Sequence, residues 1–426
     1  GTSALSGGLL YLGGGTAIQR ACGFEDSAEE MFKYMMAACG PDPDPDLIGP
    51  YCEQSVEHFE WIVARGVPFR PAFFEGAHEP FASDEGLTYS GSEHVHPFNE
   101  IARPAPRGHI TRQVSSKGSL LMQHLVAALH ASGAESRLTH RCDALVVAGD
   151  GRVIGAVVRS PEGEHRIRAK RGVLLTAGGF IFNREMVGAH APLLARCAAK
   201  VGTENDDGLG IRLGAAAGGD AIRMDSGDIS LPLFPPNQLR QGIFVNHDGA
   251  RFLNEDAYMG RAGEMVLLHQ GGKAYLVVDD EVFVRPELFP IEIAAVGESI
   301  AELQEELGIP APNLEDTLAF YNRHAERGED PLFHKGVGYL KPLSKPPFAA
   351  IDLAAENAVY SVFTLGGLRI DPNGAVLRPS GDAVPGLFAA GRTTSGIAKQ
   401  GYSSGMSLGD GSFFGRRAGG TAARSG

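Results

Sequence analysis

The sequence predicts an α/β fold in which one domain is interrupted by an inserted α+β domain. Short apolar strands run directly into glycine turns in "VLLTAGGF" (173–180) and "LFAAGR" (387–392). The stretch between them has a different composition, richer in proline and phenylalanine, from about Met224 to Ala355. Strand–glycine–helix units are typical of nucleotide-binding α/β domains. We therefore expect the first part of such a domain at 1–224, an inserted cap at 225–355 and the second part of the domain at 356–426.

The first helices are predicted from amphipathic patterns and capping residues. Residues 26–39 form a helix with Asp26 as its N-cap. A second helix is expected at 47–65, after the stiff "PDPDPD" turn at 41–46. Residues 70–108 are rich in Pro, Gly and His without periodicity, so we expect a long surface loop there.

The rest of the chain alternates strands, glycine turns and helices. Two apolar strands flank Gly149-Asp150-Gly151, which is a hairpin signal. The remaining expectations are helices at 117–132, 298–307, 314–327 and after the glycine loop 205–211, strands at 142–148, 153–159, 173–176 and 386–391, a hairpin at 366–377, and a terminal helix within 399–419.

Composition excludes several classes of function. The formal net charge is −13, which argues against nucleic acid or an anionic membrane as the main partner. No apolar run approaches the ~20 residues of a membrane span. The odd number of cysteines, without CxxC spacing, indicates buried free thiols and a cytoplasmic protein. These cysteines are Cys22, Cys39, Cys52, Cys142 and Cys197.

Glycine is unusually frequent, and one glycine-rich stretch points to a ligand. There are 57 glycines in 426 residues, about twice the usual share of ~7%. In "KQGYSSGMSLGDGSFFGRRAG" (399–419), Tyr402, Ser403 and Ser404 stand between two glycines, just before the expected terminal helix. Glycine permits close backbone approach, and a helix amino terminus attracts negative charge. This stretch is expected to hold a flat or anionic ligand with hydroxyl groups facing it.

Five glycine-rich segments in this order resemble one known family. They are 1–8 ("GTSALSGG"), 173–180, 205–211 ("NDDGLGI"), 387–392 and 407–419, and "GARFLNEDAY" (249–258) adds to them. Over nearly the whole chain the sequence resembles the flavoproteins that include fumarate reductases, succinate dehydrogenase flavoprotein subunits and 3-ketosteroid dehydrogenases. The resemblance implies a Rossmann-like FAD-binding domain, an inserted cap or catalytic domain, and a site between them.

The resemblance also implies the cofactor contacts. The family's first βαβ unit, with its GxGxxG fingerprint, would precede Gly1, so we expect the natural protein to begin earlier. Family members with covalent flavin use a histidine near the opening loop; residues 1–8 contain none, so non-covalent FAD is expected. The implied FAD contacts are Thr2, Ser3, Ser6, Gly7, Gly8, Cys142, Thr176, Ala177, Gly178, Asp207, Gly391, Arg392, Ser407 and Leu408.

Two substrate-binding arginines of the fumarate-reductase-like members are not at their usual places. Counting back from the "GRxAG" ending, the carboxylate-binding position is Tyr402. The proton-donating arginine after the "RFxNE" segment is also absent, with Arg261 slightly displaced from its place. A dicarboxylate needs such guanidinium pairs. Hydroxyl groups suit a neutral carbonyl compound instead.

The "GYSSG" and "NEDAY" forms resemble the 3-ketosteroid dehydrogenases, most of all the branch acting on the 4,5 bond of 5α-3-ketosteroids. The ketone acidifies the α-hydrogen at carbon 4, and the β-carbon loses a hydride to flavin N5. By this likeness Tyr402 and the Gly405 N–H bind the carbonyl oxygen, as in an oxyanion hole. Ser404 accepts the proton, relayed through Tyr258; the two roles are interchangeable. The implied enzyme is an FAD-dependent oxidoreductase acting on CH–CH groups, with an unidentified electron acceptor.

Other interpretations stay open at this stage. The protein could reduce a small unsaturated acid, with Arg261 as its acid, act at the 1,2 bond of a 3-ketosteroid, or be a non-catalytic binding module. Tyr402 could be a packed aromatic, Tyr258 a surface residue and Ser404 a plain cap of the terminal helix. His94 and His96 are expected to be solvated, and no metal site is predicted.

Overall fold

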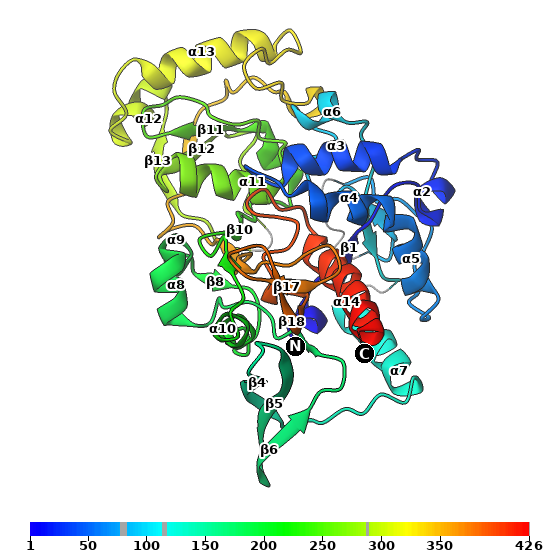
Figure 1. The fold of residues 1–426 in the computed structure, drawn as a ribbon. Coiled ribbons are helices and arrows are strands. Elements are labelled where there is room, and N and C mark those ends of the chain that lie inside the picture. The colour runs from blue at the N-terminus through cyan, green and yellow to red at the C-terminus, as the bar shows by residue number, and fades with distance from the viewer. Residues whose placement is uncertain (77–82, 113–116, 287–288, 426) are drawn as a thin grey trace.

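The computed structural model describes residues 1–76, 83–112, 117–286 and 289–425. These residues form an α/β arrangement of helices around six small sheets (Figure 1). The sheet order shows few parallel neighbours: only β18 with β7 and β15 with β8 run parallel among the described strands. The mixture of helix and strand agrees with the fold class that the sequence predicts.

The N-terminal part packs helices against a three-stranded antiparallel sheet. In this sheet β3 is central, with Leu9 of β1 opposite Ile110 and Leu87 of β2 opposite His109. The elements here are α1 (Thr2–Leu5), β1 (Leu9–Tyr11), α2 (Ala17–Ala21), α3 (Ala28–Ala38), α4 (Pro45–Glu53), α5 (Ser55–Val63), β2 (Leu87–Thr88), α6 (Phe98–Ile101), β3 (Gly108–Ile110) and α7 (Lys117–Ala131).

Two details of the predicted helices are wrong. The N-cap of α3 is Ser27, whose hydroxyl accepts from the Glu30 N–H. Asp26 instead accepts from the buried Arg107 guanidinium at 2.7 Å, because a buried cation requires a charged partner. The helix expected at 47–65 is divided at Gln54 into α4 and α5.

The segment expected as a surface loop is largely interior. Ser90, Ser92 and Glu93 are 0%, 4% and 1% exposed, so this stretch carries polar side chains into the protein. Composition misled here because Gly, Ser and His are as typical of a ligand-side loop as of a solvated one. Residues 77–82 of the predicted loop lie outside the described residues.

A separate antiparallel sheet projects from the lower end of the molecule in Figure 1. Its strands are β4 (Arg141–Val147), β5 (Val153–Ser160) and β6 (Gly163–Arg168). The first two confirm the predicted hairpin, whereas β6 was not predicted because "GEHRIR" is almost entirely polar. Next follow β7 (Val173–Leu175), α8 (Arg184–His190), α9 (Pro192–Ala195), β8 (Ala199–Lys200), α10 (Leu209–Ala216), β9 (Ala221–Ile222) and β10 (Gly227–Ser230).

The middle of the chain forms a four-stranded antiparallel sheet of order β11-β12-β14-β13, covered by helices. The helices α12 and α13 lie where the sequence predicts them, at the top of Figure 1. The elements are β11 (Ile243–Asn246), α11 (Met259–Glu264), a π-helical turn (Met265–His269), β12 (Ala274–Asp279), β13 (Ile293–Gly297), α12 (Ile300–Glu306), α13 (Asn313–Ala325) and β14 (Phe348–Asp352), with 3₁₀ turns at Asn237–Gln241 and Val337–Tyr339.

The last part returns to the first domain. The hairpin predicted at 366–377 is reduced to the single bridge Ile370–Val376, because β16 pairs with β9 and β17 pairs with β18. Parallel pairing places Leu387 of β18 beside Val173 of β7, so the two predicted glycine turns leave the sheet side by side. The elements are β15 (Ser361–Thr364), β16 (Gly367–Leu368), β17 (Ala375–Leu377), β18 (Ala383–Ala389), a 3₁₀ turn (Gly391–Thr393) and α14 (Met406–Arg424).

Two hydrophobic clusters form the core. One consists of buried residues between Phe180 and Val362. The other joins residues from Leu10 to Ala217 with residues from Leu365 to Phe414. The first cluster includes side chains that precede residue 225, and the predicted domain boundaries stay a prediction. Among the described residues, no helix combines the length and apolar character that a membrane crossing requires.

Candidate active site

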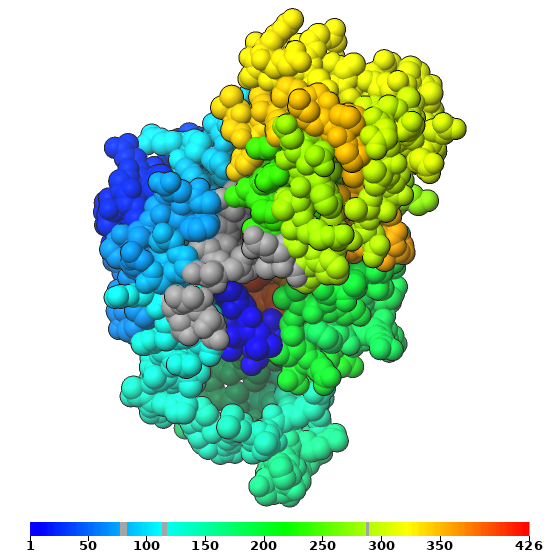
Figure 2. Space-filling model, turned by 180° about the vertical axis from the view of Figure 1, so that it is seen from behind, coloured from blue at the N-terminus to red at the C-terminus, as the bar shows by residue number. Residues whose placement is uncertain are grey.

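The glycine-rich segments meet around one buried carboxylate, Asp206. Its oxygens accept from the Thr2 hydroxyl at 2.5 Å and from the Gly179 N–H at 3.2 Å. The Arg392 guanidinium lies 3.3 Å from Asp206 Oδ1, and the Thr203 N–H donates to Oδ2. Asp206 thus joins the opening loop, the 173–180 turn, the 205–211 loop and the 387–392 turn. Figure 2 shows the first residues, in blue, lying beside the green segments of this region.

Sequence reasoning selected Asp207, the neighbour of this central carboxylate. Asp207 pairs with Arg141 at 2.8 Å and accepts from the Leu209 N–H at the start of α10. Asp206 is only 3% exposed. The sequence "NDDG" offers two adjacent acids, and only the backbone direction before the left-handed Gly208 decides which of them turns inward.

The opening loop is fixed against the start of α7. The Ser6 hydroxyl donates to the Ser3 carbonyl and accepts from the Gly8 N–H, which closes a tight turn. The Ser6 carbonyl accepts from the Gly118 N–H. A side chain at Gly8 would lie 2.5 Å from the Lys117 carbonyl carbon, and its φ is +71°, so this position requires glycine. Gly7 is exposed.

The other predicted cofactor residues lie at the end of β7 and on β4. Thr176 and Ala177 are exposed and directly precede Gly178, whose carbonyl accepts from the Thr393 hydroxyl. The half-buried Cys142 lies on β4, with its thiol 3.7 Å from the Ala144 carbonyl. No contact that the structure describes joins Cys142 to Asp206, so its cofactor role stays a prediction.

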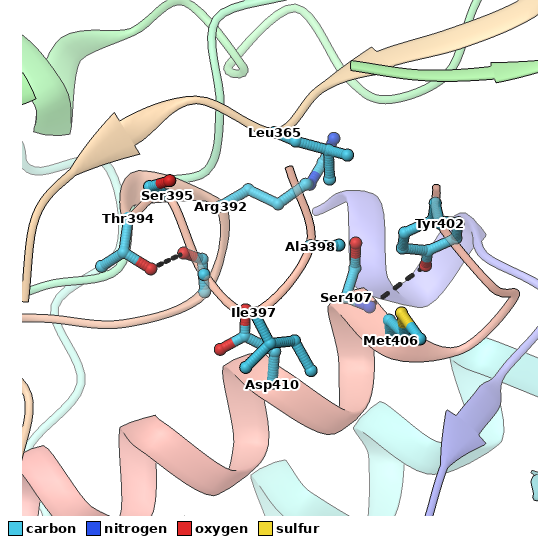
Figure 3. A pocket seen from close by; sticks show the side chains of 12 residues that line it. Leu365, Arg392, Thr394, Ser395, Ile397, Ala398, Tyr402, Met406, Ser407 and Asp410 are labelled. Atoms are coloured by element: carbon cyan, nitrogen blue, oxygen red, sulfur yellow. Dashed lines mark hydrogen bonds between the residues drawn. The ribbon is translucent and has the colours of Figure 1, made fainter. Parts of the chain in front are cut away.

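A small cavity lies between the 391–398 turn and the start of α14 (Figure 3). The Tyr402 ring is edge-on to Phe363 at 5.2 Å, and Phe363 also lies under the Arg392 guanidinium. The Tyr402 hydroxyl accepts from the Ser407 N–H at 3.1 Å. Other lining residues are Gly391, Ser395, Met406 and Asp410.

Polar side chains line this small cavity. Ser395 Oγ and Asp410 Oδ1 are buried and have no hydrogen-bond partner in the described part of the chain. Buried polar atoms are rarely left in this state without a ligand or water. Gly391 has φ +64°, and an added Cβ there would lie 3.7 Å from the Cα of Gly411 on α14, so the turn packs closely against this helix. Three predicted FAD contacts, Gly391, Arg392 and Ser407, line this cavity, and Leu408 follows on α14.

Burial raises the pKa of Asp410 to about 7. The unfolded carboxyl ionises near pH 4, so the folded protein binds the extra proton between about pH 4 and 7. The free energy of unfolding therefore falls as pH rises through this window, by up to about 4 kcal/mol. We expect Asp410→Asn to match the original protein at pH 4.5 and to be more stable at pH 8, as measured by urea unfolding.

The exposed Asp382 offers a matched control for this comparison. Asp382→Asn should leave the stability difference between pH 4.5 and pH 8 unchanged. Equal behaviour of the Asp410 and Asp382 variants at pH 8 would contradict the proposed cost of the buried charge.

The two predicted proton carriers are in direct contact. Tyr258 Oη and Ser404 Oγ are 2.7 Å apart, although the residues are 146 positions apart in the sequence. Tyr258 is 3% exposed, so it is not a surface residue. Ser404 is not a side-chain cap of the terminal helix, because the N-cap of α14 is Gly405. The alternative interpretations, Tyr258 as a surface residue and Ser404 as a plain helix cap, are therefore wrong.

Gly405 holds the loop at the start of α14. Its φ is +95°, and an added Cβ would lie 2.8 Å from the Tyr11 nitrogen. The Gly405 carbonyl accepts from the Tyr11 N–H at 3.1 Å, so the loop is attached to β1. Any residue other than glycine at this position would displace β1.

Residues that the sequence did not indicate hold the 401–404 loop in place. Glu264 accepts from the Gly401 N–H at 2.8 Å. The Ser403 hydroxyl is 3.0 Å from Tyr34 Oη, which in turn accepts from the Ser92 N–H. The Ser92 hydroxyl accepts from the Tyr258 N–H. Contacts over such sequence distances leave no local pattern that could predict them.

Arg261 is enclosed on the same helix as Tyr258. Its guanidinium lies 5.2 Å from the Phe98 ring, and burial lowers its pKa. Burial likewise raises the pKa of Glu264. His94 and His96 are both half-buried, and the His96 ring lies 4.2 Å from the His334 ring at an angle of 32°, so the two histidines are not the solvated pair that the sequence predicts.

Comparison with known proteins agrees with this arrangement. The FAD binding domain family matches residues 1–408. The structure is similar to that of 3-ketosteroid-Δ4-(5α)-dehydrogenase from Rhodococcus jostii RHA1 in complex with 4-androstene-3,17-dione, with 43% identity and a TM-score of 0.93. This similarity covers 99% of the chain and 89% of the Rhodococcus protein.

More distant relatives include a steroid 4-dehydrogenase and a probable fumarate reductase. The chain is 28% identical to a 3-oxo-5-alpha-steroid 4-dehydrogenase of Comamonas testosteroni, over 92% of the chain and 86% of that protein. It is 25% identical to a probable fumarate reductase of Shewanella frigidimarina, over 100% of the chain and 69% of that protein. The chain belongs to the FAD-dependent oxidoreductase family that includes fumarate reductases and 3-ketosteroid dehydrogenases.

Proposed function

We propose that this protein is an FAD-dependent 3-ketosteroid dehydrogenase that acts at the 4,5 bond of 5α-3-ketosteroids. The observation that carries the proposal is the 2.7 Å contact between Tyr258 Oη and Ser404 Oγ. The likeness to the Rhodococcus enzyme, over nearly the whole chain, supports the choice of substrate.

The catalytic residues have separate roles in this proposal. The Tyr402 hydroxyl and the Gly405 N–H bind the 3-keto oxygen and stabilise the enolate charge that develops on it, a contribution of a few kcal/mol. Ser404 Oγ takes the proton from carbon 4 while its own hydroxyl proton passes to Tyr258 Oη, and Tyr258 releases its phenolic proton to solvent. The short contact lets the two hydroxyls exchange protons in one step, so neither carries an extra proton.

The cofactor contacts predicted from the sequence remain a proposal that the geometry supports. Asp206 fixes Thr2 and Arg392 relative to each other, and Ser407 and Gly391 face the cavity. When bound, FAD supplies the two-electron acceptor for the hydride that leaves carbon 5. Ser395 and Asp410 provide polar atoms for the same ligand. We expect FAD to be held without a covalent bond.

The polar groups of the site favour a neutral carbonyl compound over a dicarboxylate. The 401–404 loop contains no cation, and Arg261 faces the Phe98 ring. A dicarboxylate would require two charged partners. All five cysteines are free thiols, which supports the proposed cytoplasmic location.

The proposal is tested with the protein purified in its flavin-loaded form. The flavin-loaded protein receives a saturated 5α-3-ketosteroid and an artificial electron acceptor. We expect a 4-ene-3-ketone product, detected by its near-ultraviolet absorbance and by mass spectrometry, and a loss of two hydrogens.

Three parallel reactions separate the alternatives. The 5β epimer tests stereochemistry at carbon 5, a 4-ene-3-ketosteroid tests action at the 1,2 bond, and fumarate with a reduced dye tests reduction of an unsaturated acid. Turnover of the second or third compound without turnover of the 5α-ketosteroid contradicts the proposal. A protein that binds no flavin would instead favour a non-catalytic module.

A further inference from the structure

Two histidines and a glutamate lie together on the projecting β4–β5–β6 sheet, far in sequence from the catalytic loop. His140 directly precedes β4, Glu162 lies in the turn between β5 and β6, and His165 lies on β6. The ligand-capable atoms of the three side chains all lie within 4.8 Å of one another. The proposed dehydrogenase activity uses none of these residues.

The strand register explains why these side chains meet. Arg141 of β4 is opposite Arg159 of β5, which places His140 next to the end of β5. His165 of β6 is opposite Val158, which also lies on β5. The two imidazole rings are stacked, with centroids 6.0 Å apart and an interplanar angle of 25°. The two outer strands therefore present their histidines on one face, across β5.

Hydrogen bonds orient the imidazole rings of His140 and His165. His140 Nδ1 lies 2.7 Å from the Leu138 carbonyl, which can only accept, so Nδ1 carries the proton and Nε2 keeps its lone pair. A backbone carbonyl bound to one ring nitrogen is the usual second contact of a metal-ligating histidine. Ser160 Oγ lies 2.5 Å from Glu162 Oε2 and 2.9 Å from His165 Nε2. Ser160 thus keeps the glutamate and the second histidine together.

We propose that His140, Glu162 and His165 form a binding site for a divalent transition-metal ion such as Zn²⁺. Two imidazoles and one carboxylate are the ligand set of three-ligand zinc sites with an open fourth position. Imidazole favours Zn²⁺, Cu²⁺ and Ni²⁺, whereas Mg²⁺ and Ca²⁺ prefer oxygen ligands. A bound ion would connect β4 to the β5–β6 turn and stabilise the edge of this sheet.

The site is exposed enough for an ion to reach it. His140 and His165 are half-buried and Glu162 is exposed. Arg141, next to His140, forms the ion pair with Asp207 at the start of α10. An occupied site would therefore stiffen a sheet that contacts the 205–211 loop, without contributing an atom to the cavity beside α14.

The experiment measures zinc binding by the full chain, after chelator treatment and desalting. We expect one equivalent of Zn²⁺ by calorimetry, and a rise in thermal midpoint with excess Zn²⁺, since a ligand of the folded state stabilises it. His140→Asn and His165→Asn should each weaken this binding by at least about tenfold and remove the thermal shift. Bound Co²⁺ should show a low-coordinate visible spectrum that both variants lose.

His130→Asn provides the matched control, because His130 is an exposed histidine on α7 outside the cluster. This variant should bind Zn²⁺ as the original protein does. Equal weakening by all three substitutions, or an undiminished equivalent in the His140 and His165 variants, would overturn the site and leave only adventitious surface binding. Flavin content is recorded in every sample, so a failure of the proposed dehydrogenase activity does not affect this result.

Discussion

Ser404→Ala is expected to lower kcat for 5α-3-ketosteroid dehydrogenation by about 10²–10⁴-fold, the usual contribution of a positioned acid or base. The variant removes the oxygen that contacts Tyr258 at 2.7 Å and leaves the backbone contact of Ser404 with the Ser90 carbonyl in place. Flavin content and KM should change little, because the hydroxyl acts on the proton of carbon 4. Steady-state kinetics with a saturating electron acceptor measures the effect.

Tyr258→Phe tests whether the two hydroxyls work as one unit. It keeps the buried ring and removes only the oxygen, and we expect a loss in kcat of similar size. The double variant should lose little more than either single variant, because groups that act together are strongly non-additive. Ser380→Ala, at an exposed turn where the hydroxyl contacts Asp382, is the control and should retain full kcat. Additive losses in the double variant would contradict the proposed relay.

The second large effect is expected on stability, at a buried charge cluster that supports the Tyr258 segment. Arg251 contacts Glu255 at 2.8 Å and Asp330 at 3.0 Å, and Lys335 lies 3.2 Å from Glu255. Their side chains are at most 3% exposed. Removing one partner leaves an uncompensated buried charge. We expect Asp330→Ala to lower the free energy of unfolding by about 3–5 kcal/mol.

A surface ion pair gives the comparison for this variant. Arg196 and Glu356 are 2.6 Å apart, with side chains 40% and 60% exposed. Glu356→Ala should lower the free energy of unfolding far less than Asp330→Ala, because solvent screens such pairs. Urea unfolding of both variants measures the difference. Similar costs for the two substitutions would show that the cluster contributes no more than a surface contact.

The sequence predicts the helices and strands that have strong local signals. It does not predict the details that depend on contacts between distant parts of the chain. The hairpin around Gly151 and the helices α12 and α13 have clear patterns and lie close to their expected positions. The N-cap of α3 was misplaced by one residue, because Asp26 is required by the buried Arg107. The polar strand β6 has no apolar alternation, so only its pairing with β5 makes it a strand.

Some residues of the candidate site can be predicted from the sequence, and others cannot. Tyr258 and Ser404 were named from family likeness, and the structure places their hydroxyls in contact. Asp206 was missed in favour of its neighbour, since both acids in "NDDG" have the same local pattern. Glu264 and Tyr34 hold the catalytic loop through contacts over more than 100 residues. Such contacts depend on the assembled fold and leave no mark at a fixed sequence spacing.

The short helix α11 has a mechanical consequence. Tyr258 stands at its start and Glu264 at its end, and the two side chains contact opposite ends of the 401–404 loop. Because α11 is short and moves as one element, neither contact can shift without the other. A rotation of α11 would therefore break the contact between the Tyr258 and Ser404 hydroxyls and the contact between Glu264 and Gly401 together. The proton relay would be lost in one step, while Tyr34 and Tyr11 would still hold the loop.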